Sequence, residues 1–191
     1  MVGFLSPNEE GVLRQLASGR RLVVELGCHT GPMSKLILES MPVDGHLWCI
    51  DTFCNTTGGD ELEKLEPHEQ VRRLLDRLKF FEECYTIIAG RCEQQIQFID
   101  GSLDMVFLDA AHDYESVKRD IQQWYPKLKS GGLISGHDYE RPSSTFNRAD
   151  LIKHSHLDYH GGFHYGVIRA VDEIFSKGVE HAHRMWWSAK P

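Results

Sequence analysis

The sequence predicts an α/β fold, with a single doubly wound, mostly parallel sheet of six or seven strands and helices on both faces. Two observations predict it. Short apolar runs recur along the chain, and the segments between them carry apolar residues at the three- and four-residue spacing of amphipathic helices. Such alternation is typical of parallel strands joined by right-handed crossover helices. The expected strands cover residues 22–26, 47–50, 85–89, 105–108 and 133–135.

A helix is expected before the first strand. Ser6, Pro7 and Glu9 form a helix-start signal, because a hydroxyl, a proline and a carboxylate at this spacing suit a first helical turn. The N-terminal helix is therefore expected within residues 1–20 and should end at Gly19.

The clearest internal helix carries apolar side chains from Tyr114 to Leu128 at helical spacing. Asp113 is its expected N-cap, and the pair Gly131–Gly132 is its expected stop. The other expected elements are a helix around residues 71–78, a helix over 167–175 and a closing strand over 184–189.

Length and composition favour one domain over residues 1–191, because 191 residues with 41% hydrophobic content can bury a substantial core. The connection over residues 139–165 is too long for an ordinary turn, so it is expected to be a lid or substrate loop. A polar loop over residues 55–69 is expected at the edge of the same site.

Charge and cysteine content argue against several classes of protein. The formal net charge of −7 does not suit a nucleic-acid groove, which needs clustered Lys and Arg. Five cysteines without a C-x-x-C pair favour reduced thiols over a disulfide framework or a zinc knuckle. No run approaches the roughly 20 apolar residues of a membrane span, and the first residues lack a secretory signal pattern. A cytoplasmic protein that acts on a small molecule is expected.

The first expected strand leads into a glycine turn, Val23–Gly31, and the next strand ends at Asp51. Such a turn lets a ligand approach the backbone, and an acid about twenty residues further on can bind two ribose hydroxyls. A nicotinamide site would need three glycines, whereas only Gly27 and Gly31 are present. Glu25 suits a cationic ligand without phosphate, which describes S-adenosylmethionine. A tight turn that binds no ligand is the alternative.

Polar residues follow the last two parallel strands where their carboxyl ends meet. Asp109 follows one strand and the pair His137–Asp138 follows the other. Two carboxylates and an imidazole could hold a divalent cation such as Mg²⁺ or Mn²⁺. A neutral imidazole suits Zn²⁺, Fe or Ni better, so the alternatives are that His137 only orients its neighbour and that both acids serve in metal-free hydrogen bonding.

Five ordered segments carry a resemblance to a known family: VVELGCHTG, LWCIDTF, DMVFLDAAHDYESVKRDI, KLKSGGLISGHDY and GVIRAVDEIF. Together they resemble the class I S-adenosylmethionine-dependent methyltransferases, and most of all the compact bacterial branch related to catechol-type and macrolide-sugar O-methyltransferases. The resemblance extends from Leu5 to Trp187. It implies a Rossmann-like sheet and a class I methyltransferase domain over residues 1–191.

The resemblance also implies roles for individual residues. Glu25 would lie near the ammonium group of the cofactor, Asp51 would bind the ribose hydroxyls, and His112 falls where relatives place a general base. The other implied cofactor-binding residues are Gly27, His29, Thr30, Gly31, Thr52, Arg91, Cys92 and Asp109. The implied metal ligands are Asp109, His137 and Asp138, and the implied catalytic residues are His112 and Asp109.

The chain departs from the family pattern at two places. Arg91–Cys92 stands where relatives often have an Asp–Ser pair near the adenine, which leaves the adenine contacts open. His137 stands where relatives have an Asp, which weakens the expectation of a metal.

Histidine suits the role of a base at position 112, because imidazole titrates near neutrality and can take the proton of a hydroxyl. The alternative for His112 is a capping or core residue at the start of the next helix. Four further histidines, at positions 154, 156, 160 and 164, have spacings that suggest a metal cluster. A solvated polar loop is the favoured interpretation, with substrate recognition on lid closure as the alternative.

The expected function is transfer of a methyl group from S-adenosylmethionine to a hydroxyl of a small molecule, such as a sugar or natural-product intermediate, assisted by Mg²⁺ or another divalent cation. The alternatives are a metal-independent O- or N-methyltransferase and a non-catalytic cofactor-binding module. The expected partner is a small hydroxylated acceptor, without nucleic acid or membrane, and a homodimer stays open.

Overall fold

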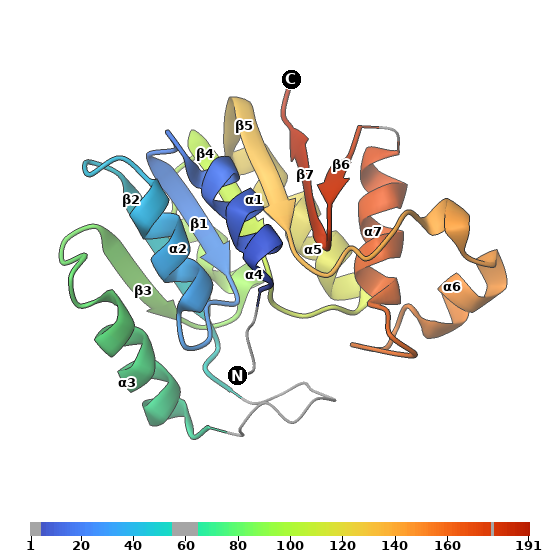
Figure 1. Ribbon diagram of the computed structural model, residues 1–191, viewed down its shortest axis with the longest axis horizontal. Helices are drawn as coiled ribbons and strands as arrows, with labels where there is room; N and C mark the ends of the chain where they lie inside the picture. The colour runs from blue at the N-terminus through green and yellow to red at the C-terminus, as the bar shows by residue number, and fades with distance from the viewer. Residues whose placement is uncertain (1–4, 55–64, 177) are drawn as a thin grey trace.

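A computed structural model describes residues 5–54, 65–176 and 178–191. Its centre is a seven-stranded sheet in the order β3-β2-β1-β4-β5-β7-β6, shown in Figure 1. The first five strands in this order pair in parallel, whereas β7 runs antiparallel to β5 and β6. The predicted mostly parallel α/β fold is therefore confirmed.

The bounds of the elements agree with most of the expected ranges. The strands are β1 (Leu22–Leu26), β2 (His46–Asp51), β3 (Tyr85–Ala89), β4 (Leu103–Leu108), β5 (Leu128–Gly136), β6 (Glu180–Ala182) and β7 (Met185–Ala189). The α-helices are α1 (Pro7–Ala17), α2 (Pro32–Ser40), α3 (Pro67–Leu78), α4 (Cys92–Gln95), α5 (Tyr114–Trp124), α6 (Arg148–His154) and α7 (Tyr165–Phe175). Three short 3₁₀ turns are η1 (Ile96–Phe98), η2 (Tyr125–Lys127) and η3 (Ser143–Thr145).

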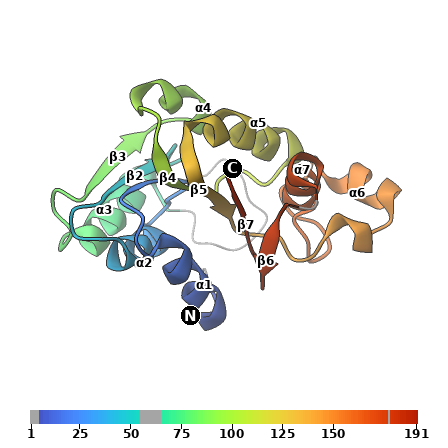
Figure 2. The ribbon, with the colours of Figure 1, turned by 90° about the horizontal axis from the view of Figure 1, so that it is seen from above.

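Helices cover both faces of the sheet, as Figure 2 shows. Successive side chains of a strand point to opposite faces, so neighbours such as Val23 and Val24 enter different cores. Val23 packs in the cluster that includes residues of α1, α2 and α3, whereas Val24 packs with residues of α5 and α7. The sheet is thus buried on both sides, which explains why its strands read as apolar runs.

The helix-start signal at the N-terminus is confirmed. Ser6 caps α1, because its hydroxyl accepts a hydrogen bond from the Glu9 amide while the Glu9 carboxylate accepts one from the Ser6 amide at 2.6 Å. The reciprocal pair fixes the Glu9 carboxylate at the first turn of the helix.

The predicted end of the 113–128 helix is wrong. The α-helix stops at Trp124 and turns through η2, which contains Pro126, and β5 then begins at Leu128. Proline lacks the N–H that the next helical hydrogen bond would need. The expected stop at Gly131–Gly132 lies inside β5 instead.

The short strand β6 was not expected from the sequence. It has three residues, all exposed or half-buried, and it lies at the edge of the sheet beside β7. A strand this short has no apolar run to mark it, so only its pairing with β7 defines it.

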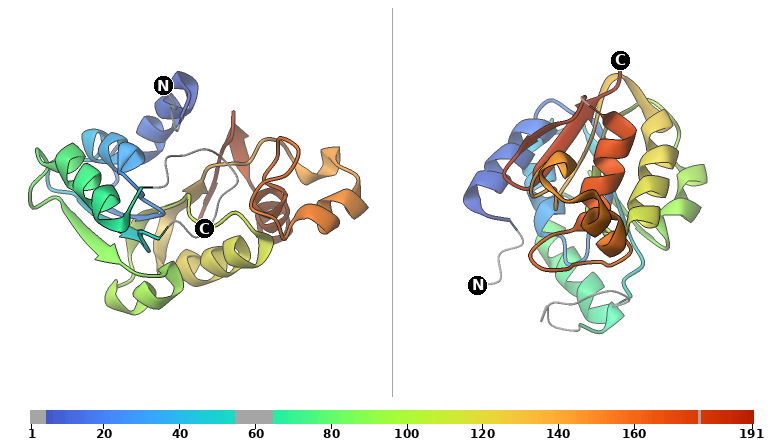
Figure 3. Two further views of the ribbon diagram at one scale, coloured as in Figure 1. Left: turned by 90° about the horizontal axis from the view of Figure 1, so that it is seen from below. Right: turned by 90° about the vertical axis from the view of Figure 1, so that its right-hand side faces the viewer.

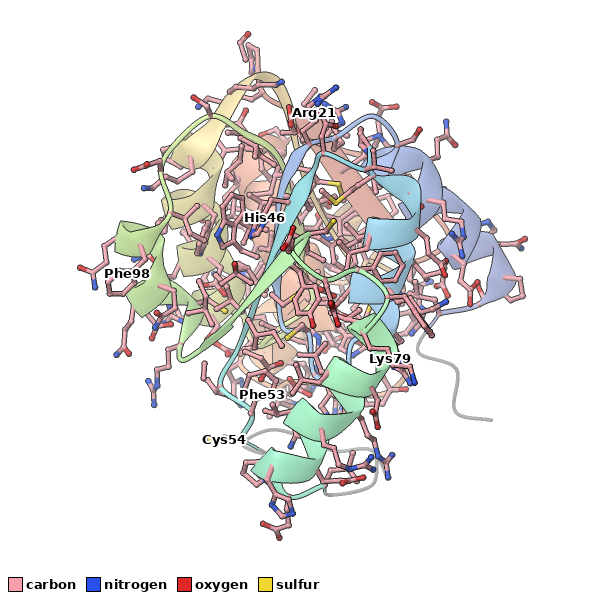
Figure 4. All side chains as sticks on the ribbon, turned by 90° about the vertical axis from the view of Figure 1, so that its left-hand side faces the viewer. Arg21, His46, Phe53, Cys54, Lys79 and Phe98 are labelled. Atoms are coloured by element: carbon pink, nitrogen blue, oxygen red, sulfur yellow. The ribbon has the colours of Figure 1, made fainter. Side chains whose placement is uncertain are left out.

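The segment over residues 139–165 contains η3 and the helix α6, and the right-hand view in Figure 3 shows α6 in front of α7. Figure 4 shows Phe53 and Cys54 beyond the carboxyl end of β2, at the end of the molecule opposite Arg21. Residues 55–64 of the predicted 55–69 loop lie outside the described residues, and the prediction is wrong for residues 67–69, which form the first turn of α3 behind Pro67. Among the described residues, no helix is long and apolar enough to span a bilayer.

Candidate active site

The candidate site lies where β1, β4 and β5 end side by side. Leu26 pairs with Leu108, and Leu108 pairs with Gly136, so the residues that follow these three strands emerge next to one another. This register brings together the segments that begin at Gly27, Asp109 and His137. The predicted adjacency of the last two strand ends is confirmed.

His112 lies among three carboxylates. Its Nε2 atom is 3.2 Å from Asp138 Oδ2 and 3.6 Å from an oxygen of Asp109. Its Nδ1 atom lies 2.9 Å from Asp158 Oδ1, a contact that spans 46 residues of sequence. Burial disfavours the charged ring, but the three carboxylates outweigh it and raise the pKa of His112 well above 6.5. Asp113, and not His112, is the N-cap of α5.

His137 is buried between two acids. Its Nδ1 atom is 3.1 Å from Asp138 Oδ1, and its Nε2 atom is 3.4 Å from Glu9 Oε1. Burial opposes protonation, but Asp138 and Asp109 raise the pKa of His137 to about 9. The imidazole is therefore cationic at neutral pH in the protein without a bound cation.

Asp138 is the centre of this cluster. Its backbone is left-handed, with φ of 62°, which turns the chain sharply after β5. Burial raises its pKa, but the bonds and charges of His112 and His137 dominate and lower that pKa well below 3.8. Arg184 adds a further cation, with Nη1 at 3.4 Å from Asp138 Oδ1.

His164 also belongs to this cluster, so the preferred interpretation of all four lid histidines as a solvated polar loop is wrong for one of them. Its Nδ1 atom lies 2.7 Å from Glu140 Oε1 and 3.4 Å from Asp138 Oδ1, and its side chain is 12% exposed. The residue occupies the N-cap position of α7, whose packing on α5 carries it to the site. The rings of His154 and His160 instead stack on each other, with their centroids 4.1 Å apart.

Glu25, at the end of β1, is fully buried. One carboxylate oxygen accepts a hydrogen bond from the Ser34 hydroxyl at 2.5 Å, and the other has no hydrogen-bond partner in the part of the chain that the structure describes. Burial, with the charges of Asp109 and Asp51, raises the pKa of Glu25 to about 8. A cationic group beside Glu25 would lower this pKa again and pair with the ionised carboxylate.

Asp51, at the end of β2, holds the turn after β1. One of its oxygens accepts from the His29 amide and the other from the Phe53 amide, both at 2.7 Å. The carboxylate therefore orders the glycine turn as well as standing at the predicted ribose position.

Packing within the protein already requires glycine at both positions of the turn. Gly27 has φ of +89°, and a Cβ there would lie 2.1 Å from the Asp109 carbonyl oxygen. Gly31 has φ of +78°, and its Cβ would lie 2.3 Å from Leu74 Cδ1. Both positions need glycine before any ligand is considered.

The remaining predicted cofactor-binding residues differ in exposure. Thr30 and Cys92 are buried, whereas Thr52 is exposed. The Arg91 guanidinium is exposed and lies 3.8 Å from Glu93. Cys92 begins α4 after β3, and burial raises the pKa of its thiol far above the ordinary range.

A family model described as "Methyltransferase domain" matches residues 24–139, which extend from within β1 to just beyond β5 and contain Asp109, His112, His137 and Asp138. The chain belongs to this family. The resemblance to class I S-adenosylmethionine-dependent methyltransferases is thereby confirmed.

Solved structures share the fold of this methyltransferase domain. A putative caffeoyl-CoA O-methyltransferase from Staphylococcus aureus has a TM-score of 0.68 and 17% identity over 100% of this chain and 86% of that one. An O-methyltransferase from Bacillus cereus in complex with SAH has a TM-score of 0.67 and 14% identity, and the match covers 100% of this chain and 84% of that one.

A curated relative, the uncharacterized protein y4gI of Sinorhizobium fredii, is 29% identical over 132 residues. The match covers 63% of this chain and 13% of that protein, so the chain corresponds to a small part of the relative.

The structure brings together Asp109, His112, His137 and Asp138 from the sequence-predicted set. It adds residues to which sequence reasoning assigned no role at the site, Glu9, Glu140, Asp158 and Arg184, and it adds His164, which was expected to lie in a solvated loop. Glu9 was recognised only as a helix-start residue, and nothing in the spacing of the 139–165 segment marks Asp158. Tertiary contacts alone reveal these roles.

Glu25→Gln should change how stability depends on pH. The folded-state pKa of about 8 exceeds the unfolded value of 4.5, so the contribution of Glu25 is fully present below pH 4.5 and is lost as pH rises through 8. Glutamine does not titrate, so the variant should be more stable than the wild type at pH 8, by on the order of 3 kcal/mol. Urea unfolding from pH 5 to 8 measures the difference. Glu82→Gln, at an exposed turn, is the matched control and should show none.

Proposed function

We propose that the chain is an S-adenosylmethionine-dependent O-methyltransferase that acts on a hydroxyl of a small molecule, with His112 as the general base and a divalent cation assisting. The observation that carries the proposal is the placement of His112. Its Nε2 atom faces Asp109 and Asp138 at the carboxyl ends of adjacent strands, while Asp158 holds its Nδ1 atom. The O-methyltransferases among the structural neighbours support the choice of a hydroxyl acceptor.

The residues around the glycine turn fit S-adenosylmethionine, which supplies the methyl group. The buried carboxylate oxygen of Glu25 without a hydrogen-bond partner among the described residues suits the cofactor's ammonium group. Asp51 stands at the end of the neighbouring strand, where a carboxylate can bind ribose hydroxyls. Gly27 and Gly31 determine the shape of the turn that follows β1.

Asp109, His137 and Asp138 fit a divalent cation, because one ligand atom from each lies within 4.8 Å of the others. Such a cation would offset negative charge near His112 and stabilise the alkoxide that forms on the acceptor. His112 must be neutral to take the acceptor's proton on Nε2, and Asp158 accepts the hydrogen bond from Nδ1 that fixes this tautomer.

One observation favours a metal-independent reaction as a second candidate. With its pKa raised to about 9, His137 is itself a buried cation beside Asp109 and Asp138. An imidazolium there could supply positive charge in place of a metal. Activity that survives exhaustive chelation would select this mechanism.

The cofactor is tested by calorimetric titration with S-adenosylhomocysteine, with Mg²⁺, without it and after chelation. Binding supports the proposal, and a cation-dependent signal supports the metal set. If no binding occurs under any condition, the proposed function is wrong.

Asp51→Ala should weaken S-adenosylhomocysteine binding by at least about 10-fold, because a bidentate carboxylate contact to ribose is lost and each such bond to a charged group contributes roughly 1.5–3 kcal/mol. The variant also loses the acceptors for the His29 and Phe53 amides, so some loss of stability is expected. Titration calorimetry combined with thermal unfolding separates the two effects. Unchanged affinity in a folded variant would contradict the ribose role.

A further inference from the structure

A second donor set shares Asp138 with the proposed cation site. One ligand atom from each of His112, Asp138 and His164 lies within 4.8 Å of the others. His112 approaches Asp138 Oδ2 at 3.2 Å, and His164 approaches Oδ1 at 3.4 Å. Donors bound to one ion at about 2.0–2.2 Å lie roughly 3–4 Å apart, so these separations suit a shared metal.

The geometry points to a binding site for a borderline transition-metal ion such as Zn²⁺ at His112, Asp138 and His164, whose occupation inhibits methyl transfer. The binding part stands by itself. The inhibition rests on the proposed function, because it depends on His112 acting as the base.

A carboxylate supports the His112 imidazole from behind, as is usual for metal-binding histidines. Asp158 lies 2.9 Å from Nδ1 of His112, which leaves the lone pair on Nε2. That Nε2 atom is buried and faces Asp138 Oδ2 at 3.2 Å and Asp109 Oδ1 at 3.6 Å.

Glu140 contacts both the Nδ1 atom and the backbone amide of His164, at 2.7 and 3.2 Å, and so fixes the position of the second imidazole. Nδ1 is also the atom that faces Asp138, so an ion at this set would take the place of the ring's hydrogen bond to Glu140.

The type of donor decides which ion this set prefers. Two imidazoles and one carboxylate suit Zn²⁺ and other borderline ions, whereas Mg²⁺ prefers oxygen ligands. The set of Asp109, His137 and Asp138 has two carboxylates and one imidazole, so it is the better of the two for Mg²⁺. Both sets need Asp138, so the two ions should compete.

Occupation of the new set would remove the base. The His112 lone pair that would accept the acceptor's proton would instead form the bond to the metal. The neighbouring carboxylates raise the pKa of His112, so metal binding competes with protonation of Nε2, and a proton held there is released to solvent when the metal binds. No other bond changes, so inhibition should be reversed by a chelator.

The binding test uses Co²⁺ as an optical probe and Zn²⁺ in competition with it, on the whole chain. The expected result is one Co²⁺ with a nitrogen- and oxygen-type spectrum, displaced by Zn²⁺. His164→Ala should weaken binding at least about 10-fold, since it removes a ligand. The control variants His160→Ala and His137→Ala should each weaken Co²⁺ binding by less than His164→Ala does. His164→Gln serves as a second variant, because its amide can still donate to Glu140.

Three outcomes would overturn the site. A sulfur-to-metal charge-transfer band would place the ion on cysteine thiolates. A loss in His160→Ala would place it on the stacked histidines of the lid. If His137→Ala loses Co²⁺ binding while both His164 variants fold and keep it, the ion lies instead at the set of Asp109, His137 and Asp138.

The inhibition is measured as the ratio of methyl transfer with and without Zn²⁺ within each variant, at fixed Mg²⁺. The ratio should fall at least about 10-fold in the wild type and return toward one in the His164 variants. Equal inhibition in all variants would overturn the inhibitory role. S-adenosylhomocysteine titration of the same samples tests the proposed function separately, because cofactor binding does not need His164.

Discussion

Gly27→Ala should lower the free energy of unfolding by about 4 kcal/mol or more, because the new methyl group must displace backbone that cannot move cheaply. Its Cβ would lie 2.1 Å from the Asp109 carbonyl oxygen and 2.7 Å from the Ala110 Cα atom. These atoms belong to the chain that leaves β4 for the site. Urea unfolding measures the loss of stability.

Gly19→Ala separates the clash from the backbone conformation. Gly19 also has a positive φ, +75°, but nothing lies within 4 Å of its Cβ position. Only the left-handed conformation is penalised there, at a cost of roughly 1–2 kcal/mol. Equal losses in the two variants would show that close contact with Asp109 is not what requires glycine at position 27.

His112→Ala should slow methyl transfer by about 10²–10⁴-fold, the usual contribution of a general base, while S-adenosylhomocysteine binding stays within about twofold of the wild type. The imidazole lies beside Asp109 and Asp138 and not at the glycine turn, so cofactor affinity should not depend on it. The measurements are kcat with an acceptor selected from a panel of hydroxylated compounds, and calorimetric affinity for the cofactor product.

Asp113→Asn is the control for His112, because it alters the neighbouring N-cap of α5 and leaves the ring in place. Asparagine caps helices about as well as aspartate, so kcat should be nearly unchanged. Parallel losses of cofactor binding and transfer in His112→Ala would contradict the division of roles between His112 and Asp51.

The central strands and most helices follow from the sequence, because a strand that is buried on two faces is a run of apolar residues. Runs such as Met105–Leu108 are apolar since both sides of each strand enter a core. Element boundaries that depend on a single residue or on pairing with another strand were harder to predict from the sequence. The end of α5 at Trp124 depends on Pro126, and β6 exists only through its pairing with β7.

By itself the sequence determined the strand ends at which Asp51, Asp109 and Asp138 stand, because strand periodicity and parallel topology bring such positions to one edge. Only the tertiary structure decided that Asp158 and His164 join them. Both come from the long connection after β5, where no periodic pattern fixes the path, and their positions result from packing of α7 on α5. Residues that are brought together by the path of a loop have no characteristic sequence spacing from which their contact could be predicted.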